Sequence, residues 1–168
     1  TTNNVINIDS TSTLAADQNV VANRTIWADV NNSGRMSLSN NNALGDVWTI
    51  RGNYHGDNGL LVMDVELNDD NSNTDKLVIE GDTSGTTRVA VNNIGGAGAL
   101  TTEGIRIIEV AGNSNGEFTQ EGRIVGGAYE YYLHKNGASA ATQNDGNWYL
   151  RSALPTVTPD PDPNPNPN

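Results

Sequence analysis

The 168-residue sequence has no cysteine, a single phenylalanine and no apolar segment that approaches the ~20 residues of a membrane-spanning helix. Without disulfides, a domain of this size has to be stabilised by apolar burial and backbone hydrogen bonds. Strong helix formers do not accumulate at 3.6-residue spacing, which excludes a helical bundle. Basic residues are scarce as well. Nine Lys and Arg stand against twenty Asp and Glu, and the formal net charge of −11 argues against nucleic acid or an anionic membrane as a partner.

Asparagine and glycine are abundant instead, with 25 and 18 residues. Both residue types tolerate the left-handed backbone of tight turns, and threonine, which is also common, favours strands. The apolar residues form short runs, and several of these alternate with period two, as in Leu61/Met63/Val65/Leu67. Such runs predict short strands with one buried and one exposed face, and they argue against a disordered chain.

Residues 1–128 form a repetitive zone in which short apolar runs are separated by Asn/Gly/Asp/Ser clusters. Two-residue hairpin signals are scarce, which argues against the antiparallel neighbours of a sandwich. Short strands joined by Asn-rich and Gly-rich corners favour an all-β solenoid. In such a parallel β-helix each coil stacks on the last, and corner amides hydrogen-bond along the stack. At about 20–25 residues per coil, the zone holds about five or six coils.

Residues 129–153 contain five of the nine aromatic residues. An open solenoid end exposes unpaired amides and apolar surface, and terminal caps cover it. Two candidate strands, residues 128–135 and 147–152, predict an antiparallel capping hairpin across the last coil. The side chains expected to fold and cap this end are Tyr129, Tyr131, Tyr132, Leu133, Trp148, Tyr149 and Leu150. Alanine at Trp148 is therefore expected to be far more damaging than alanine at a corner residue such as Asn93.

Residues 154–168 end in alternating prolines. Proline lacks an amide proton, so this segment cannot form a helix or join a strand ladder. We interpret it as an extended linker of polyproline type rather than as a binding motif.

Four motifs follow one another in a specific order: Trp48-Thr-Ile-Arg-Gly-Asn-Tyr-His-Gly, Asp75-Lys-Leu-Val-Ile-Glu-Gly-Asp-Thr-Ser-Gly, Gly104-Ile-Arg-Ile-Ile-Glu-Val and Asp145-Gly-Asn-Trp-Tyr-Leu-Arg-Ser. The series covers about residues 45–152 and resembles the autochaperone region at the C-terminal end of pertactin-type autotransporter passengers. Residues 1–44 carry no motif of that family and are expected to form generic preceding coils.

The resemblance implies a right-handed parallel β-helix with a C-terminal capping hairpin, followed by a linker and an outer-membrane β-barrel. It implies as partners the protein's own upstream passenger and its C-terminal barrel, neither of which is recognisable in these 168 residues, and a host protein. It also implies a bacterial virulence factor at the cell surface or outer membrane, secreted through the periplasm.

Several motifs suggest chemistry but are better explained as structure. Gly81-Asp-Thr-Ser-Gly85 carries an extra threonine relative to a serine-protease motif, and a nucleophile needs an oriented base. The two histidines, His55 and His134, are far apart in sequence. Gly95-Gly-Ala-Gly98 is not followed by a helix that could hold phosphate, and the scattered acids offer no pair for glycoside cleavage. We therefore expect no enzyme activity, no catalytic residue and no cofactor.

The acidic corner Asp69-Asp-Asn-Ser-Asn-Thr-Asp75 places oxygen ligands at alternate positions, with Glu80 where a calcium loop has its bidentate glutamate. Thr74 stands in place of the required glycine, however. A solvated acidic corner is the better interpretation, and no metal is expected to be needed.

Two functional hypotheses remain. The first is an autochaperone segment, which nucleates β-helix folding of the passenger and promotes its secretion across the outer membrane. The second is an adhesin-type surface, whose coils bind a host protein or glycan. The predicted cap favours the first hypothesis, because a folding nucleus needs a closed end and a binding surface does not.

Overall fold

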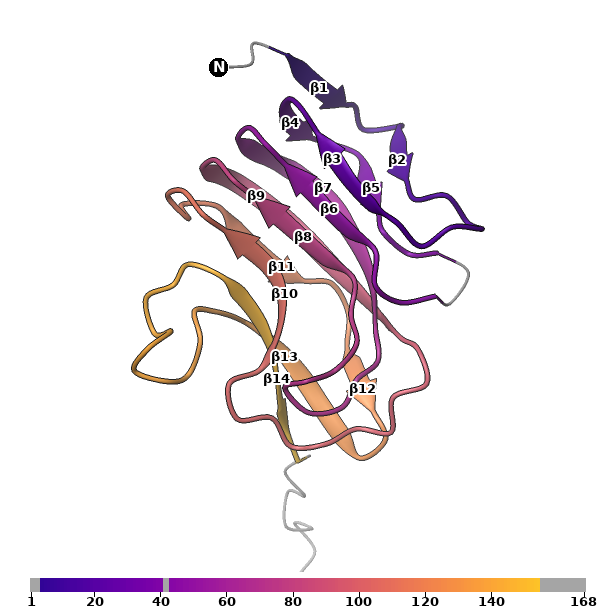
Figure 1. The fold of residues 1–168 in the computed structure, drawn as a ribbon, viewed down its shortest axis with the longest axis vertical. Helices are drawn as coiled ribbons and strands as arrows, with labels where there is room; N and C mark the ends of the chain where they lie inside the picture. Colours follow the sequence, from indigo (N-terminus) through magenta and orange to yellow (C-terminus); the bar gives the residue numbers. More distant parts are fainter. Residues whose placement is uncertain (1–3, 41–42, 155–168) are drawn as a thin grey trace, which may run out of the picture.

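The computed structural model describes residues 4–40 and 43–154, and every regular element in that part of the chain is a strand (Figure 1). No helix long and apolar enough to cross a membrane occurs there. The strands are β1 (Val5–Ile8), β2 (Thr13–Ala15), β3 (Asn23–Ile26), β4 (Asp29–Asn32), β5 (Arg35–Ser37), β6 (Val47–Ile50), β7 (Tyr54–Val65), β8 (Lys76–Ile79), β9 (Thr83–Asn93), β10 (Ile105–Val110), β11 (Glu117–Gln120), β12 (Ile124–Gly126), β13 (Tyr129–Lys135) and β14 (Trp148–Ala153).

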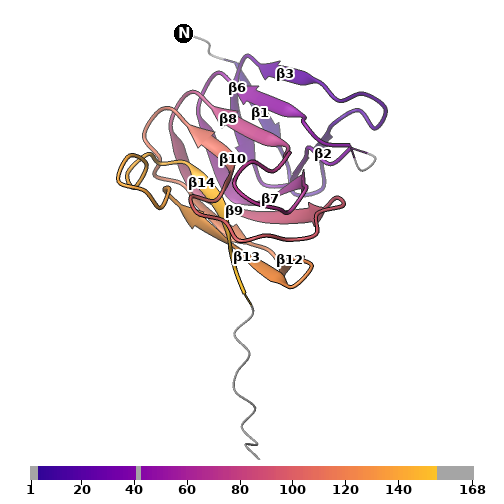
Figure 2. The same cartoon turned by 60° about the horizontal axis from the view of Figure 1, so that its bottom comes forward.

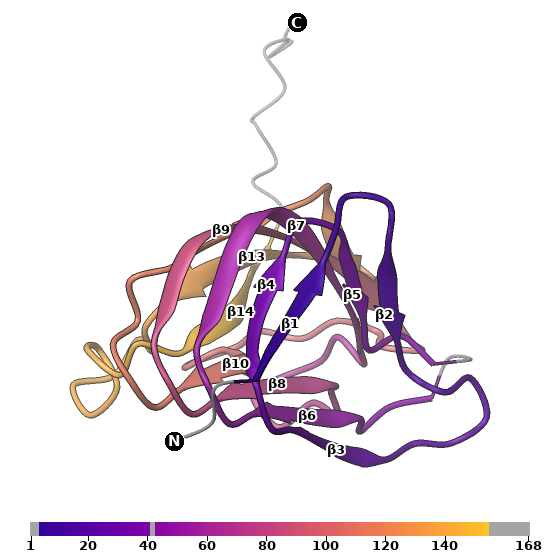
Figure 3. The same cartoon turned by 90° about the horizontal axis from the view of Figure 1, so that it is seen from above.

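Successive coils stack in parallel, as the short strands and polar corners predict. β1, β4, β7, β9 and β11 pair in that order, and β2 and β5 join the second half of the long strand β7. β3, β6, β8 and β10 form a second parallel sheet, which lies across the interior from the first (Figure 3). The result is a β-solenoid of about four turns, which confirms the predicted all-β fold class.

Corner side chains hydrogen-bond from one coil to the next. Asn53 N donates to Asp29 Oδ1 at 2.8 Å, 24 residues earlier. Asp82 N donates to Asn53 Oδ1 over a step of 29 residues, and Asn113 N donates to Asp82 Oδ1 over a step of 31 residues. The coils thus lengthen along the chain. The expectation of five or six coils of about 20–25 residues is therefore wrong, because longer corner loops occupy the later coils.

The core lies between the two sheets and is mostly aliphatic. The four alternating residues from Leu61 to Leu67 are fully buried, as their spacing predicts. The expectation that the opposite face of this strand is exposed is wrong, because Val62 and Asp64 are buried too. Neighbouring coils cover that face. Asn92 Nδ2, for example, donates to Asp64 Oδ1 at 3.0 Å.

The direction of pairing reverses at one end of the solenoid. β14 pairs antiparallel with β10, β13 with β14, and β12 with β13 (Figure 2). This confirms the predicted capping hairpin. The antiparallel part begins earlier than expected, however, because Ile124 in the zone assigned to coils already pairs with Tyr131. The predicted linker, apart from Leu154, lies outside the described residues.

Two glycines test how tightly the coils stack. Gly85 and Gly95 both have φ of +73°, so alanine at either position carries the same left-handed backbone cost, about 1–2 kcal/mol. A Cβ on Gly85 would meet the carbonyl oxygen of Gly56 on the adjacent coil at 1.8 Å, whereas a Cβ on Gly95 would meet nothing within 4 Å. We expect Gly85→Ala to lower the free energy of unfolding in urea by about 1–3 kcal/mol more than Gly95→Ala. Equal losses would contradict the close stacking of these coils.

Candidate functional site

A line of buried aromatic rings connects the cap to the interior of the solenoid. Trp148 on β14 meets Phe118 on β11 edge to face, with ring centroids 5.4 Å apart, and Phe118 stacks on Tyr54 of β7 at 5.9 Å. Sequence reasoning missed Phe118 and Tyr54 as partners of the cap. The only signal for Phe118 is that it is the single phenylalanine of the sequence, a lone apolar residue between Glu117 and Thr119. These rings make the cap part of the same core as the coils.

Six of the seven predicted capping residues are buried or partly buried, and five of them belong to the core or pack against it, since Tyr149 faces the other side of β14. Four are buried, namely Tyr131, Trp148, Tyr149 and Leu150, and two are partly buried, namely Tyr129 and Leu133. Tyr132 differs, because it follows Tyr131 on β13 and points to the opposite side of the strand. Its side chain is 44% exposed, so it adds no buried ring.

Hydrogen bonds also attach the cap to corner loops of earlier coils. Tyr131 OH donates to the carbonyl oxygen of Asn68 at 2.7 Å and accepts from Ala99 N at 3.1 Å. Burial raises the pKa of Tyr131, so the phenol stays protonated and can donate. Ser152 N donates to Thr101 Oγ1, and Thr101 N donates to Ser152 Oγ at 2.9 Å. The hairpin is therefore held by residues more than 30 positions earlier in the chain.

The loop before β14 is fixed by a buried phenol. Tyr149 OH donates to Asp145 Oδ2, and Asn147 Oδ1 accepts from Val110 N at 2.9 Å. Burial, with the neighbouring Asp145 carboxylate, raises the pKa of Tyr149 to about 12. The phenol therefore remains a donor throughout the physiological pH range.

The acidic corner at residues 69–75 is not solvated in the way the sequence suggested. The Asp70 carboxylate accepts three backbone N–H groups from residues 102–104, each at 2.9 Å. Asp75 is fully buried. Across the described part of the chain, no group of three or more His, Cys, Asp and Glu side chains could hold a metal ion. The structure therefore uses these two acids as hydrogen-bond acceptors that organise backbone.

Asp75 lies in a cluster of three buried carboxylates with Asp46 and Asp64. Its two oxygens accept Asp46 N at 3.0 Å and Asp64 N at 2.9 Å. None of the ion pairs among the described residues involves these three acids. Burial raises the pKa of Asp75 to about 7, opposed by the two backbone N–H groups and assisted by the negative charges of Asp64 and Asp46.

The structure places Ser84 next to His55, although the two residues are far apart in the sequence. Ser84, in the stretch that resembles a protease motif, lies with its Oγ 2.8 Å from His55 Nδ1. The two residues occupy the same register position on neighbouring coils, β7 and β9. In the part of the chain that the structure describes, no carboxylate hydrogen-bonds to the His55 ring, so the third member of a triad is not supplied there. The geometry is that of a polar pair between neighbouring parallel strands.

The fold and the cap define a class: a parallel β-solenoid segment whose stack is closed by an antiparallel hairpin. Residues 28–133 match the family described as Autochaperone Domain Type 1. That match covers more than half of the chain, and the chain belongs to this family. It starts earlier than the resemblance at residues 45–152 suggested, so it includes coils that carry no recognisable motif.

Relatives of known name agree with this assignment. The chain is 53% identical, over 63% of its length, to the adhesin BmaC autotransporter of Brucella suis, and 47% identical, over 62% of its length, to the autotransporter adhesin AIDA-I of Escherichia coli. It is also 47% identical, over 92% of its length, to the uncharacterized protein YuaQ of Escherichia coli K12. The matches span 3%, 8% and 11% of those proteins. The sequence also suggested a particular member, the Shigella autotransporter that recruits the host actin machinery. These matches do not show that identity.

The buried Asp75 is expected to make stability depend on pH. Its pKa of about 7 in the folded state lies above the ordinary value of 3.8, so the folded protein binds this proton more tightly than the unfolded chain. The stabilisation is fully present below about pH 4 and is lost as the pH rises through 7. We expect Asp75→Asn to flatten the fall in melting temperature between pH 5 and pH 8.

Comparing Asp75→Asn with the wild-type protein cancels the contribution of other titrating groups to the pH profile. His134 acts in the opposite sense, because burial and Arg151 lower its pKa, but it is present in both proteins. Asp57→Asn, at an exposed acid, is the matched control and should keep the wild-type pH profile. A pH profile that Asp75→Asn leaves unchanged would show that this carboxyl is already ionised in the fold.

Proposed function

We propose that this chain is the autochaperone segment of an autotransporter passenger, which folds first, seeds the β-helix and promotes secretion of the passenger across the outer membrane. The proposed role involves no catalytic step and no cofactor. The observation that carries it is the asymmetry between the two ends of the solenoid. Within residues 4–40 and 43–154, one end is closed by an antiparallel strand, and the other presents parallel edges.

The closed end supplies the neighbouring strand that a first coil lacks. A coil that forms alone must close its loops without a neighbour to pair with, whereas each later coil gains a template. Here β10 is paired on one side by β8 and on the other by β14. Trp148 and Tyr131 cover the core at the same end. The last coil can therefore become stable with a strand paired on each side, and the coils before it can add to a finished surface.

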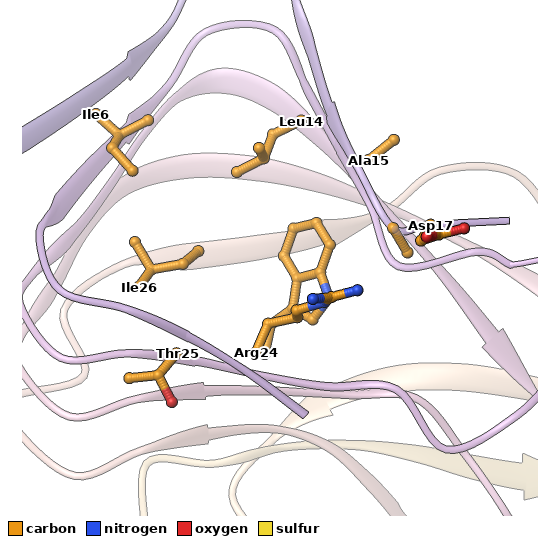
Figure 4. Close-up of a pocket in the computed structure, with 9 residues that line it drawn as sticks. Ile6, Leu14, Ala15, Asp17, Arg24, Thr25 and Ile26 are labelled. Carbon is orange, nitrogen blue, oxygen red and sulfur yellow. The ribbon is translucent and has the colours of Figure 1, made fainter. Parts of the chain in front are cut away.

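The open end has the shape that an added coil needs. β1, β2 and β3 are the terminal strands of their stacks within the described residues (Figure 3). A groove of about 570 Å³ opens between them, and Ile6, Leu14 and Ile26 line it (Figure 4). Trp48, also in its lining, has a buried Nε1 with no hydrogen-bond partner among the described residues. An incoming coil would fill the groove with apolar side chains.

This proposal assigns the chain to the bacterial surface and gives it two partners. Its upstream passenger would stack on β1–β3, and a C-terminal β-barrel would hold the passenger at the outer membrane after transit through the periplasm. The small share of BmaC and AIDA-I that the chain matches supports a role as one segment of a much longer protein.

An adhesin-type surface that binds a host protein or glycan is the second candidate. It is favoured by the names of BmaC and AIDA-I, both described as adhesins. Trp27 on the outside of the solenoid is 61% exposed, and the Arg51 guanidinium lies 4.3 Å from its ring centroid. An exposed ring of this kind is a contact surface that a folding nucleus does not require.

The two candidates separate in a full-length autotransporter that carries this segment. Trp148→Ala removes a buried ring of the cap, and such changes cost about 3–5 kcal/mol, a large part of a domain's stability. We expect Trp148→Ala to reduce the amount of protease-resistant passenger on the cell surface by several fold, while the barrel still inserts. Limited proteolysis of intact cells measures this directly.

The matched control is Tyr132→Ala, which removes a ring of the same hairpin that is largely exposed. Asn93, expected from sequence to be a tolerant corner, is unsuitable. Its Oδ1 accepts from Leu67 N at 3.1 Å and from Gly96 N at 2.9 Å, so its loss would leave backbone donors unpaired. Normal surface folding of Trp148→Ala together with lost adhesion to host cells would favour the adhesin candidate.

A further inference from the structure

The middle of the loop that joins β13 to β14 is held to the solenoid by one carboxylate, whereas its end is bound by Ser114 Oγ, which donates to Gly146 O, and by Val110 N, which donates to Asn147 Oδ1. Ser139 N donates to Glu103 Oε1 at 3.3 Å, and Thr142 Oγ1 donates to Glu103 Oε2. The three alanines of this loop are exposed, so apolar burial does not hold it. Gly137 is buried beneath the same contact, since a Cβ there would meet Glu103 Oε2 at 1.8 Å.

Glu103 is itself positioned by an acid from the preceding coil. Asp70 Oδ1 accepts from Thr102 N and Gly104 N, and Asp70 Oδ2 accepts from Glu103 N, each at 2.9 Å. Burial raises the pKa of Asp70, but the three backbone N–H groups outweigh it and hold the pKa below the ordinary value. Asp70 is therefore a carboxylate at neutral pH, and its charge strengthens all three bonds.

A cation completes the arrangement. Arg151 on β14 donates from Nε to the carbonyl oxygen of Glu103 at 3.4 Å, and from a terminal nitrogen to the carbonyl oxygen of Asn136 at 2.7 Å. A hollow of about 310 Å³ lies beside these contacts, and Asp70, Glu103 and Thr142 are among its lining residues. The junction is thus polar and incompletely packed, in contrast to the aromatic core beneath it.

We propose that Asp70 and Glu103 form a latch that fastens the cap loop, residues 136–147, to two stacked corner loops. Asp70 lies in the loop between β7 and β8, and Glu103 lies in the loop between β9 and β10. Asp70 shapes residues 102–104, and this turn presents the Glu103 carboxylate to Ser139 and Thr142. The latch therefore fastens the cap loop after the Asp70 corner has folded, whereas the ladder between β13 and β14 does not include the latch. Asp70 is a positioning residue in this arrangement, because it acts on the loop through Glu103. This inference rests on the proposed function only in treating cap closure as a folding step.

Hydrogen exchange of the purified chain tests whether Asp70 acts on the cap loop through Glu103, because the two variants should then release different sets of amides. Glu103→Gln keeps a side chain of the same shape but weakens acceptance from the loop. We expect it to speed exchange of the Gly137, Thr142 and Asp145 amides by about tenfold or more, while residues 102–104 stay protected. Asp70→Asn places an amide NH2 against a backbone N–H. It should speed exchange both at residues 102–104 and in the cap loop.

The double variant and two controls make the result decisive. Asp70→Asn with Glu103→Gln should exchange no faster in the cap loop than Asp70→Asn alone, because both act on one contact. Asp29→Asn, a matched corner acid that accepts Asn53 N at 2.8 Å, should leave the cap loop protected. Asp70→Ala should reproduce Asp70→Asn, and exchange of β6 and β8 should stay unchanged throughout.

Three results would overturn the latch. They are an Asp70→Asn cap loop that stays protected, a Glu103→Gln variant that releases residues 102–104 equally, and a uniform rise that includes β6 and β8. The measurement is made on purified protein and does not depend on secretion. Normal surface display of a full-length Trp148→Ala variant would count against the proposed function, whereas the exchange pattern alone decides the latch.

Discussion

The unpaired edge of a parallel sheet is the constraint on which the rest of this structure depends. A stack of coils always ends in a strand whose backbone groups lack partners on one side, and such an edge invites further pairing. Here β10 meets β14 running in the opposite direction, with Ile105 opposite Leu150. The other edge of β14 is already paired with β13, so no further coil can add there. The stack therefore stops at this end, and Trp148 and Tyr131 cover the core that would otherwise be exposed.

The two ends consequently have different uses. The capped end joins aromatic burial to hydrogen bonds with Asn68, Ala99 and Thr101, so it also fastens corners of earlier coils as these fold onto it. At the other end of the described part of the chain, β1–β3 and an apolar groove are accessible to a neighbouring coil. In a solenoid, stability is the sum of coil and interface terms, so growth from the capped end toward the open end gains one interface with each added coil.

Sequence periodicity was sufficient for the fold class and the cap, though not for the number of coils, because strands and aromatic clusters are local patterns. Alternation around Leu61 and the aromatic residues near Trp148 are visible within a few positions. The buried acids could not be predicted in this way. Asp70 and Asp75 look like solvated corner residues until partners as many as 34 positions away supply backbone N–H groups. The contact between His55 and Ser84 is set by coil length, and loop insertions make the coil length irregular.

The central claim is that folding begins at the capped end and spreads coil by coil toward β1. Pulsed hydrogen exchange during refolding of the chain from urea, read out amide by amide, tests it most directly. The account predicts that amides of β10, β13 and β14 gain protection first, those of β6 and β8 next, and those of β1–β3 last. Protection of β1–β3 before the cap, or simultaneous protection of all strands, would contradict it.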